Sequence, residues 1–168
     1  PVGLSGSARS SSAPIEDWKR VMTLNFEQAV KMTAGVLPYM RAHGWGRIVN
    51  ITSIAGLENS GPVPYCAAKA ALTAYTHSMG RVLAVESPGV VMCAVAPGVI
   101  KTAGGYWDNA APEHVAEYLR TRTPTGRFQT MAELAPLVAF DCWEPPAASH
   151  AAIIAADQGQ SRHYAAHT

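Results

Sequence analysis

The sequence has no C-x-x-C pair, no run of charge of one sign and no hydrophobic stretch long enough to cross a membrane. Its three cysteines, Cys66, Cys93 and Cys142, are an odd number without disulfide or metal spacing, so we expect thiols in a reducing compartment. The 13 basic and 12 acidic residues leave no electrostatic footprint for nucleic acid or a membrane surface. We therefore expect a cytoplasmic protein without a nucleic-acid or membrane partner.

Two other familiar signals are missing. The sequence shows no secretory leader, and it begins at Pro1 without an initiator Met. Its first segment is rich in Ser and Gly, and we predict a loop over residues 1–13. His163 and His167 lie four residues apart, but they stand in a polar tail (158–168) without further ligands, so we expect no metal. What remains, 48% hydrophobic and 15% charged residues, is typical of one globular domain.

Helical and apolar segments alternate along the chain. Apolar residues at three- and four-residue steps predict long helices over 14–42 and 65–86, a shorter one near 112–121, and another that the capping box Thr130–Glu133 begins. Between them, "RIVNITS" (47–53), "VVMCAVAPG" (90–98) and "AAIIAAD" (151–157) are predicted strands. Apolar strands separated by helices predict an α/β fold with a doubly wound parallel sheet.

Tyr65 and Lys69 stand four residues apart at the start of the second long helix, so both side chains share one face. A phenol has an ordinary pKa of about 10, and a neighbouring ammonium stabilises the phenolate. We therefore predict that Lys69 lowers the pKa of Tyr65 and that the pair exchanges protons near neutral pH. By itself the spacing is weak, because a helix-end Tyr and a solvent-facing Lys have the same pattern.

Position strengthens the chemical interpretation. Ser53 ends the strand before this helix, and "APGVIKT" follows the next strand. Ligands bind beyond the carboxyl ends of parallel strands, so these segments are predicted to meet Tyr65 at one site.

Together these segments resemble the short-chain dehydrogenase/reductases of the single-domain branch, and are similar to 3-oxoacyl-acyl-carrier-protein reductases. The resemblance rests on "IEDWKRVMTLNF", "GRIVNITSIAG", "YCAAKAAL", "VAPGVIKT", "TPTGRFQTMAELAPLVAF" and "AADQGQS". It implies a Rossmann-type domain of which residues 1–168 are the C-terminal part, without the N-terminal βαβ half.

The resemblance also implies roles. Tyr65 would be the general acid/base, Lys69 would lower its pKa and hold the nicotinamide ribose, Ser53 would orient the substrate oxygen, and Asn25 would keep a relay water. The family's nicotinamide contacts would fall on Tyr65, Lys69, Pro97, Gly98, Ile100 and Thr102. Residues 103–126 would form a substrate lid whose Tyr106 and Trp107 could line the pocket, although aromatic residues there are as often packing.

Several features depart from the family. The Gly-rich phosphate turn is absent, since "GWGRIV" precedes a strand, and so is the residue that selects NAD or NADP. The family usually has Asn at Cys93 and Gly at Ala151 and Gln158, which bears on packing and stability. Gly80, inside a helix, is expected to cost up to about 1 kcal/mol relative to Ala.

Three functions remain open. The first is an NAD(P)-dependent oxidoreductase that acts on a carbonyl or secondary alcohol, as a homodimer or homotetramer through helices 14–42 and 65–86. The second is a truncated, non-catalytic remnant that serves only in packing or dimerisation, because the missing half predicts poor cofactor binding by this chain. The third, epimerisation or dehydration, is disfavoured by the "PGVIKT" turn.

Overall fold

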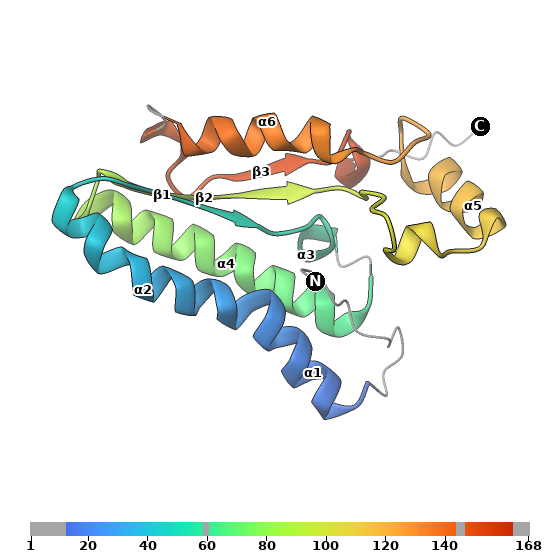
Figure 1. Ribbon diagram of the computed structural model, residues 1–168, viewed down its shortest axis with the longest axis horizontal. Coiled ribbons are helices and arrows are strands. Elements are labelled where there is room, and N and C mark those ends of the chain that lie inside the picture. Colours follow the sequence, from blue (N-terminus) through green and yellow to red (C-terminus); the bar gives the residue numbers. More distant parts are fainter. Residues whose placement is uncertain (1–12, 59–60, 144–146, 163–168) are drawn as a thin grey trace.

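The computed structural model describes residues 13–58, 61–143 and 147–162, arranged as a parallel sheet between helices (Figure 1). The predicted N-terminal loop, except Ala13, and the last six residues of the predicted tail lie outside the described residues. The strands are β1 (Gly46–Ile51), β2 (Val90–Pro97) and β3 (Ile153–Ala156), and the helices are α1 (Ile15–Met22), α2 (Gln28–His43), α3 (Ala55–Glu58), α4 (Val63–Glu86), α5 (Pro112–Arg122) and α6 (Met131–Cys142). Four short helical segments complete the chain: η1 (Thr23–Glu27), η2 (Tyr106–Asp108), η3 (Ala147–Ser149) and η4 (Gln160–Arg162).

The three strands pair in the order β1-β2-β3, all parallel. Gly46 of β1 is level with Val90 of β2, and Ala94 of β2 is level with Ile153 of β3. Every residue of β2 is buried, as expected for a strand with neighbours at both edges and helices on both faces. The predicted doubly wound α/β architecture is confirmed.

Helices cover the two faces of the sheet. In Figure 1, α2 and α4 lie side by side below the strands and α6 lies above them. The buried core between α2, α4 and the sheet is formed by Leu37, Leu83, Val90 and Met92. The two long predicted helices therefore share one layer, and the carboxyl ends of all three strands point toward α5 (Figure 1).

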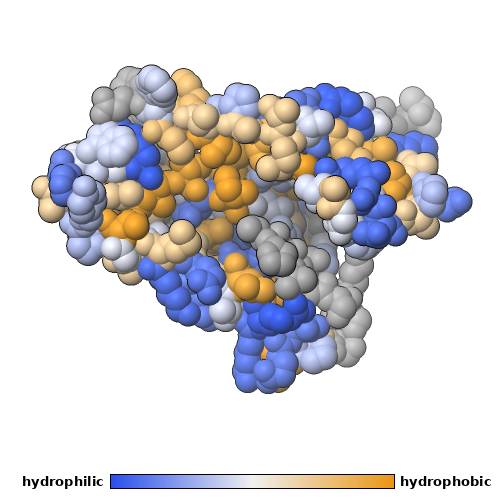
Figure 2. Space-filling model, viewed as in Figure 1, coloured by the Kyte–Doolittle hydropathy of each residue, from blue (hydrophilic) through white to orange (hydrophobic). Residues whose placement is uncertain are grey.

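Strand β1 forms one edge of the sheet, with no further strand beside it among the described residues. Trp45, just before it, is 47% exposed, and Ile51 at its end is 39% exposed. Figure 2 shows hydrophobic surface across the middle of the molecule, between the α2 and α6 layers. An apolar edge of this kind is open to pairing with another strand.

Several element boundaries differ from the prediction: α4 begins at Val63 and not at Tyr65, and β3 covers only Ile153–Ala156. The first strand ends at Ile51, so Ser53 lies just beyond it, and the predicted loop contains the one-turn helix α3. The first long helix is interrupted by η1, a π-helical segment over Thr23–Glu27. The capping box at α6 is confirmed, because the side chains of Thr130 and Glu133 each bond the other's backbone N–H.

Gly80 has a packing reason that the sequence did not show. A Cβ there would lie 2.7 Å from the backbone N of Ala151 and 2.8 Å from the carbonyl oxygen of Met92. Glycine therefore lets α4 approach β2 and the segment before β3 closely. Ala151 has φ 61° and Gln158 has φ 56°, and they are the non-glycine residues with positive φ in the described part of the chain. Both stand where the family usually has Gly, so the predicted effect on stability has a backbone cause.

Candidate active site

Helix α4 places Tyr65 and Lys69 at the carboxyl end of β1. Pro62 precedes α4 and Pro64 is its second residue. A backbone N–H in the first turn has no partner within the helix, so proline costs no hydrogen bond there, and Tyr65 follows in the same turn. Helix α3 packs directly on the next turn: a Cβ on Gly56 would lie 2.6 Å from the carbonyl carbon of Lys69. This contact fixes the segment after Ser53 against the helix that carries Tyr65.

Ser53 lies close enough to Tyr65 for its hydroxyl to act on the phenol, and it opposes in part the rise that burial causes in the pKa of Tyr65. The Ser53 Oγ also accepts a hydrogen bond from the backbone N of Ala55, at 3.1 Å. A hydroxyl has one proton to donate and two lone pairs, so the Ala55 contact leaves the Ser53 proton for Tyr65. Ser53, which follows β1, is therefore the neighbour that can orient the hydroxyl of the half-buried Tyr65.

Burial raises the pKa of Tyr65 above its ordinary value, and Ser53 only partly opposes this rise. The prediction that Lys69 lowers this pKa is wrong for this structure. The cause is desolvation, which disfavours the phenolate and which the sequence pattern alone could not show. At neutral pH the Tyr65 hydroxyl therefore carries its proton.

Lys69 is 5% exposed and donates a hydrogen bond from Nζ to the carbonyl oxygen of Ile51, at 2.9 Å. Its ammonium lies over the Tyr65 ring, 5.7 Å from the ring centroid. Burial lowers the pKa of Lys69 to about 8, still above neutrality, so the group is mainly cationic at pH 7. The structure thus brings together Ser53, Tyr65 and Lys69.

Asn25 reaches the same helix from η1. It is buried, and its Nδ2 donates to the carbonyl oxygen of Val21 at 3.0 Å. Its neighbour Phe26 packs edge-on against Tyr75 of α4, with ring centroids 6.0 Å apart. π-Helical turns occur often at functional sites, and this one turns an amide inward at the predicted fourth catalytic position.

The turn after β2 lies beside the Ser53 segment. The backbone N of Ile54 donates to the carbonyl oxygen of Pro97 at 3.1 Å. A Cβ on Gly98 would lie 2.9 Å from Cα of Asp157, so only glycine allows this approach. Ile100 follows, half-buried and bridged to Gln129. The predicted nicotinamide turn therefore lies at the same sheet edge as Ser53.

The lid segment (residues 103–126) contains η2 and α5, and its aromatic residues pack mainly on one another. Trp107 stacks on His114 with ring centroids 5.4 Å apart, and it contacts Tyr118 at 4.3 Å. Tyr106 is 61% exposed and its hydroxyl bonds Nε2 of His114 at 3.2 Å. These contacts hold Tyr106 and Trp107 in one aromatic cluster of the lid segment, and a pocket role for the two residues stays a prediction.

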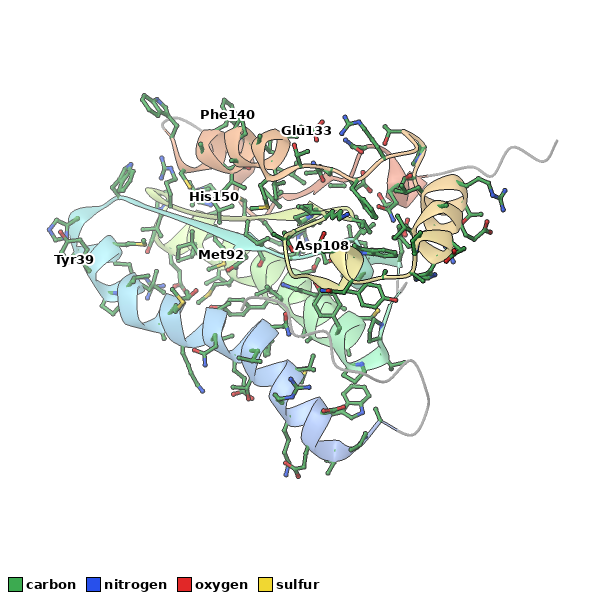
Figure 3. The ribbon with its side chains drawn as sticks, turned by 45° about the vertical axis from the view of Figure 1, so that its right-hand side comes forward. Tyr39, Met92, Asp108, Glu133, Phe140 and His150 are labelled. Atoms are coloured by element: carbon green, nitrogen blue, oxygen red, sulfur yellow. The ribbon has the colours of Figure 1, made fainter. Side chains whose placement is uncertain are left out.

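A carboxylate anchors the start of the lid segment. Asp108 accepts a hydrogen bond from the backbone N of Gly104 at 2.9 Å and pairs with Lys101 at 3.4 Å, and these contacts lower its pKa. Thr102 is exposed, and its Oγ1 lies where a Cβ on Gly105 would clash. Figure 3 shows Asp108 within the lid segment and Tyr39 far from it, at the left of the view.

The sequence profile described as "short chain dehydrogenase" matches residues 1–110. The chain belongs to the short chain dehydrogenase family. It is 37% identical over 131 residues to a 3-oxoacyl-[acyl-carrier-protein] reductase of Aquifex aeolicus, a match that covers 76% of this chain and 50% of that protein. It is 32% identical over 128 residues to a 2-dehydro-3-deoxy-L-rhamnonate dehydrogenase (NAD(+)) of Sphingomonas, covering 76% of this chain and 49% of that protein.

A solved structure shares the family fold. A crystal structure assigned as a gluconate dehydrogenase from Agrobacterium tumefaciens superposes with a TM-score of 0.86 at 26% identity, covering 96% of this chain and 63% of that one. The chain spans about half the length of the curated relatives it matches. These relatives are oxidoreductases, so the predicted family is confirmed.

The residues of this chain could hold only part of a nicotinamide dinucleotide. Lys69 Nζ carries three protons, one of which bonds Ile51, and it can donate to sugar hydroxyls beside Tyr65. The turn that contains Gly98 lies beside the Ser53 segment, because the backbone N of Ile54 bonds the carbonyl oxygen of Pro97. No Gly-rich turn follows a strand in the described segments, so the residues present fit the nicotinamide end and not the phosphates. The described residues hold no group of three His, Cys, Asp or Glu that could bind a metal ion.

Sequence reasoning missed Gln160, a buried residue just after β3. Its Oε1 accepts a hydrogen bond from the backbone N of Val99 at 3.2 Å, and its Nε2 donates to the hydroxyl of Tyr118 at 2.6 Å. Gln160 lies in "AADQGQS", one of the segments on which the family resemblance rests, but the contacts of its side chain could be found only from the folded chain.

Proposed function

We propose that this chain carries the proton-transfer side of an NAD(P)-dependent oxidoreductase acting on a carbonyl or secondary alcohol, with Tyr65 as general acid/base. The observation that supports it is the position of the buried Lys69 ammonium, 5.7 Å from the centroid of the Tyr65 ring and bonded to the end of β1, with Ser53 close to the same phenol. A phenol, a hydroxyl and a cation at a strand's carboxyl end are suited to moving one proton to or from a substrate oxygen.

The chemistry follows from the protonation states. In reduction, Tyr65 donates its hydroxyl proton to the carbonyl oxygen, to which Ser53 also donates a hydrogen bond. The raised pKa of Tyr65 keeps the phenol protonated at pH 7, which favours reduction over alcohol oxidation at neutral pH. Lys69, with its pKa of about 8, stays mainly cationic and lies beside the Tyr65 ring.

The nicotinamide, when bound, supplies or accepts the hydride. Lys69 and Tyr65 would hold its ribose, and Pro97, Gly98, Ile100 and Thr102 would hold the ring and carboxamide. Asn25 would keep a water in the proton relay. NAD and NADP both stay open, because the residues that distinguish them have no counterpart in this sequence.

The substrate class follows from the relatives. One relative is named for 3-oxoacyl groups on acyl carrier protein and another for a deoxy sugar acid, both small carbonyl or alcohol compounds. We therefore expect a small 3-oxoacyl or sugar-acid substrate covered by the lid segment, with Tyr106 and Trp107 at the pocket's outer side.

Self-association is part of the proposal. Helices α2 and α4 lie side by side on one face (Figure 1), and both expose apolar residues: Met32, Val36, Tyr39, Val82 and Val85. We expect these helices to form a homodimer or homotetramer. No helix among the described residues is long and apolar enough to span a bilayer, and a cytoplasmic location stays a prediction.

The alternative is a non-catalytic chain that serves only in packing or dimerisation. The exposed apolar edge of β1 favours it, because such an edge can pair with a strand of another chain.

Turnover by the purified chain separates the two functions. NADH and NADPH oxidation should be followed with 3-oxoacyl thioesters and keto sugar acids as substrates, and cofactor affinity measured by nucleotide fluorescence. Oxidation that depends on both substrate and chain supports the oxidoreductase. Neither binding nor oxidation, from a chain that is folded by circular dichroism, supports the non-catalytic alternative.

A further inference from the structure

The side chain of Gln160 joins two segments that are far apart in the sequence. It is 7% exposed, and its two polar ends bond different elements: Oε1 accepts from the backbone N of Val99 and Nε2 donates to the hydroxyl of Tyr118. Val99 belongs to the turn after β2, and Tyr118 belongs to α5 of the lid segment. One amide therefore spans the predicted nicotinamide turn and the lid.

The backbone around Gln160 is held tightly. The carboxylate of Asp157 accepts hydrogen bonds from the backbone N of Gly159 at 3.0 Å and of Ser161 at 2.7 Å. The backbone N of Gln160 itself donates to the carbonyl oxygen of Asp157 at 3.0 Å. Because its own backbone is fixed, the Gln160 amide can transmit a displacement of one partner to the other.

Tyr118 moves with the lid's aromatic cluster. Its ring lies 4.3 Å from the ring of Trp107, which in turn packs on His114 and on Phe128 at 5.4 Å. In Figure 1, α5 extends away from the sheet, beyond the carboxyl ends of the strands. A displacement of α5 would therefore break the 2.6 Å bond to Gln160 before it disturbed the sheet.

We propose that Gln160 is a positioning residue that couples the lid segment to the turn after β2. With α5 in place, Tyr118 fixes the amide and Oε1 holds the Val99 N–H; when α5 moves away, the amide is released and the turn loosens. Glutamine suits this role because it carries a donor and an acceptor on one rigid group. The coupling rests on the proposed function only in identifying this turn as the nicotinamide site.

Amide hydrogen exchange of the 168-residue chain, measured by NMR, tests the coupling without any ligand. Tyr118→Phe removes the lid end of the bridge and leaves Val99 untouched, so exchange at Val99 should rise at least fivefold. Gln160→Met removes both bonds and should raise it at least tenfold. The amide of Ala94, bonded to Ala152 within the sheet, should be unchanged in both variants.

Thr121→Val is the matched control on α5, because this hydroxyl bonds only one turn back, to the carbonyl oxygen of Glu117. It should leave Val99 exchange as in the wild type. Equal acceleration at Val99 and Ala94 would show a general loss of stability and overturn the coupling, as would unchanged Val99 exchange in Tyr118→Phe. If Gln160→Met does not fold, Tyr118→Phe and Thr121→Val decide the question.

A titration with reduced nicotinamide mononucleotide separates this inference from the proposed function. Binding by the wild type that weakens at least threefold in Tyr118→Phe, and not in Thr121→Val, supports both. Absence of binding by the wild type would count against the proposed function, while faster Val99 exchange in Tyr118→Phe would still establish the coupling. Unweakened binding together with unchanged exchange would overturn the coupling alone.

Discussion

The ammonium of Lys69 donates a hydrogen bond to the carbonyl oxygen of Ile51, and this contact ties the helix that carries Tyr65 to the end of β1. The same burial that makes the contact possible lowers the pKa of Lys69 from 10.5 to about 8. A buried cation that is held this way affects both the chemistry of the site and the stability of the fold.

The pH dependence of stability should show the buried Lys69. Its folded pKa lies below its unfolded pKa, so Lys69 binds more protons in the unfolded chain between pH 8 and 10.5, and its own contribution to stability rises with pH in that window. From pH 7.5 to 9.5 the free energy of unfolding should rise by about 2 kcal/mol relative to Lys69→Met. Urea unfolding across this range measures the difference.

Lys101→Met, a change at an exposed lysine, is the control. It should leave the slope of unfolding free energy against pH as in the wild type. The measurement stops below pH 10 because the raised pKa of Tyr65 acts the other way: above pH 10 the unfolded chain loses the phenol proton first and stability falls. Parallel curves for wild type and Lys69→Met would contradict the burial of a charged lysine.

Gly80→Ala should destabilise the fold by about 1–2 kcal/mol, although alanine favours helices by about 1 kcal/mol. The new Cβ would meet the backbone of Ala151 and Met92, which cannot yield as a side chain can. Gly35→Ala on α2 is the control: it has open space around it and should stabilise by up to about 1 kcal/mol. Thermal unfolding of both variants measures the difference. Equal stabilisation by Gly80→Ala and Gly35→Ala would disprove the close packing of α4 against Ala151 and Met92.

Ala151→Gly should stabilise the chain by about 1 kcal/mol, because φ of 61° is strained for alanine and ordinary for glycine. Its backbone bond to Met92 is kept. The neighbouring Ala152, which lacks a positive φ, provides the comparison: Ala152→Gly should lower stability by about 0.5–1 kcal/mol. A loss of stability in Ala151→Gly would mean that the backbone is not strained there.

Val85→Glu should separate the proposed oligomer. Val85 is 84% exposed on α4, and a charge there would have to be buried in an interface through α2 and α4. Light scattering after gel filtration should show a dimer or tetramer for the wild type and a smaller species for Val85→Glu. Met131→Glu, at a position on α6 that is 57% exposed, should keep the wild-type mass, and a monomeric wild type would refute the interface.

The sequence predicted features that depend on local patterns. The capping box of Thr130 and Glu133 was visible because both partners lie within one helical turn. The parallel sheet followed from apolar strands between helices, and the meeting of Ser53 with Tyr65 followed from where parallel strands end. These features need only the chain's periodicity and the rules of sheet topology.

Other features depend on burial and distant contacts. The π-helical turn around Asn25 has no compositional signal, and the sign of the Tyr65 pKa shift depends on desolvation in the folded state. The need for glycine at Gly80 and the bridge made by Gln160 both involve residues more than 40 positions away. Such contacts appear only when the elements are packed together.

The account's central claim is that the hydroxyl of Tyr65 transfers the proton to the substrate oxygen. The initial rate of NAD(P)H-dependent carbonyl reduction by Tyr65→Phe, compared with that of the exposed-site control Tyr39→Phe, tests it most directly. A loss of at least a thousandfold in Tyr65→Phe, with the wild-type rate in Tyr39→Phe, is the predicted result. A Tyr65→Phe chain that reduces the carbonyl as fast as the wild type would contradict the claim.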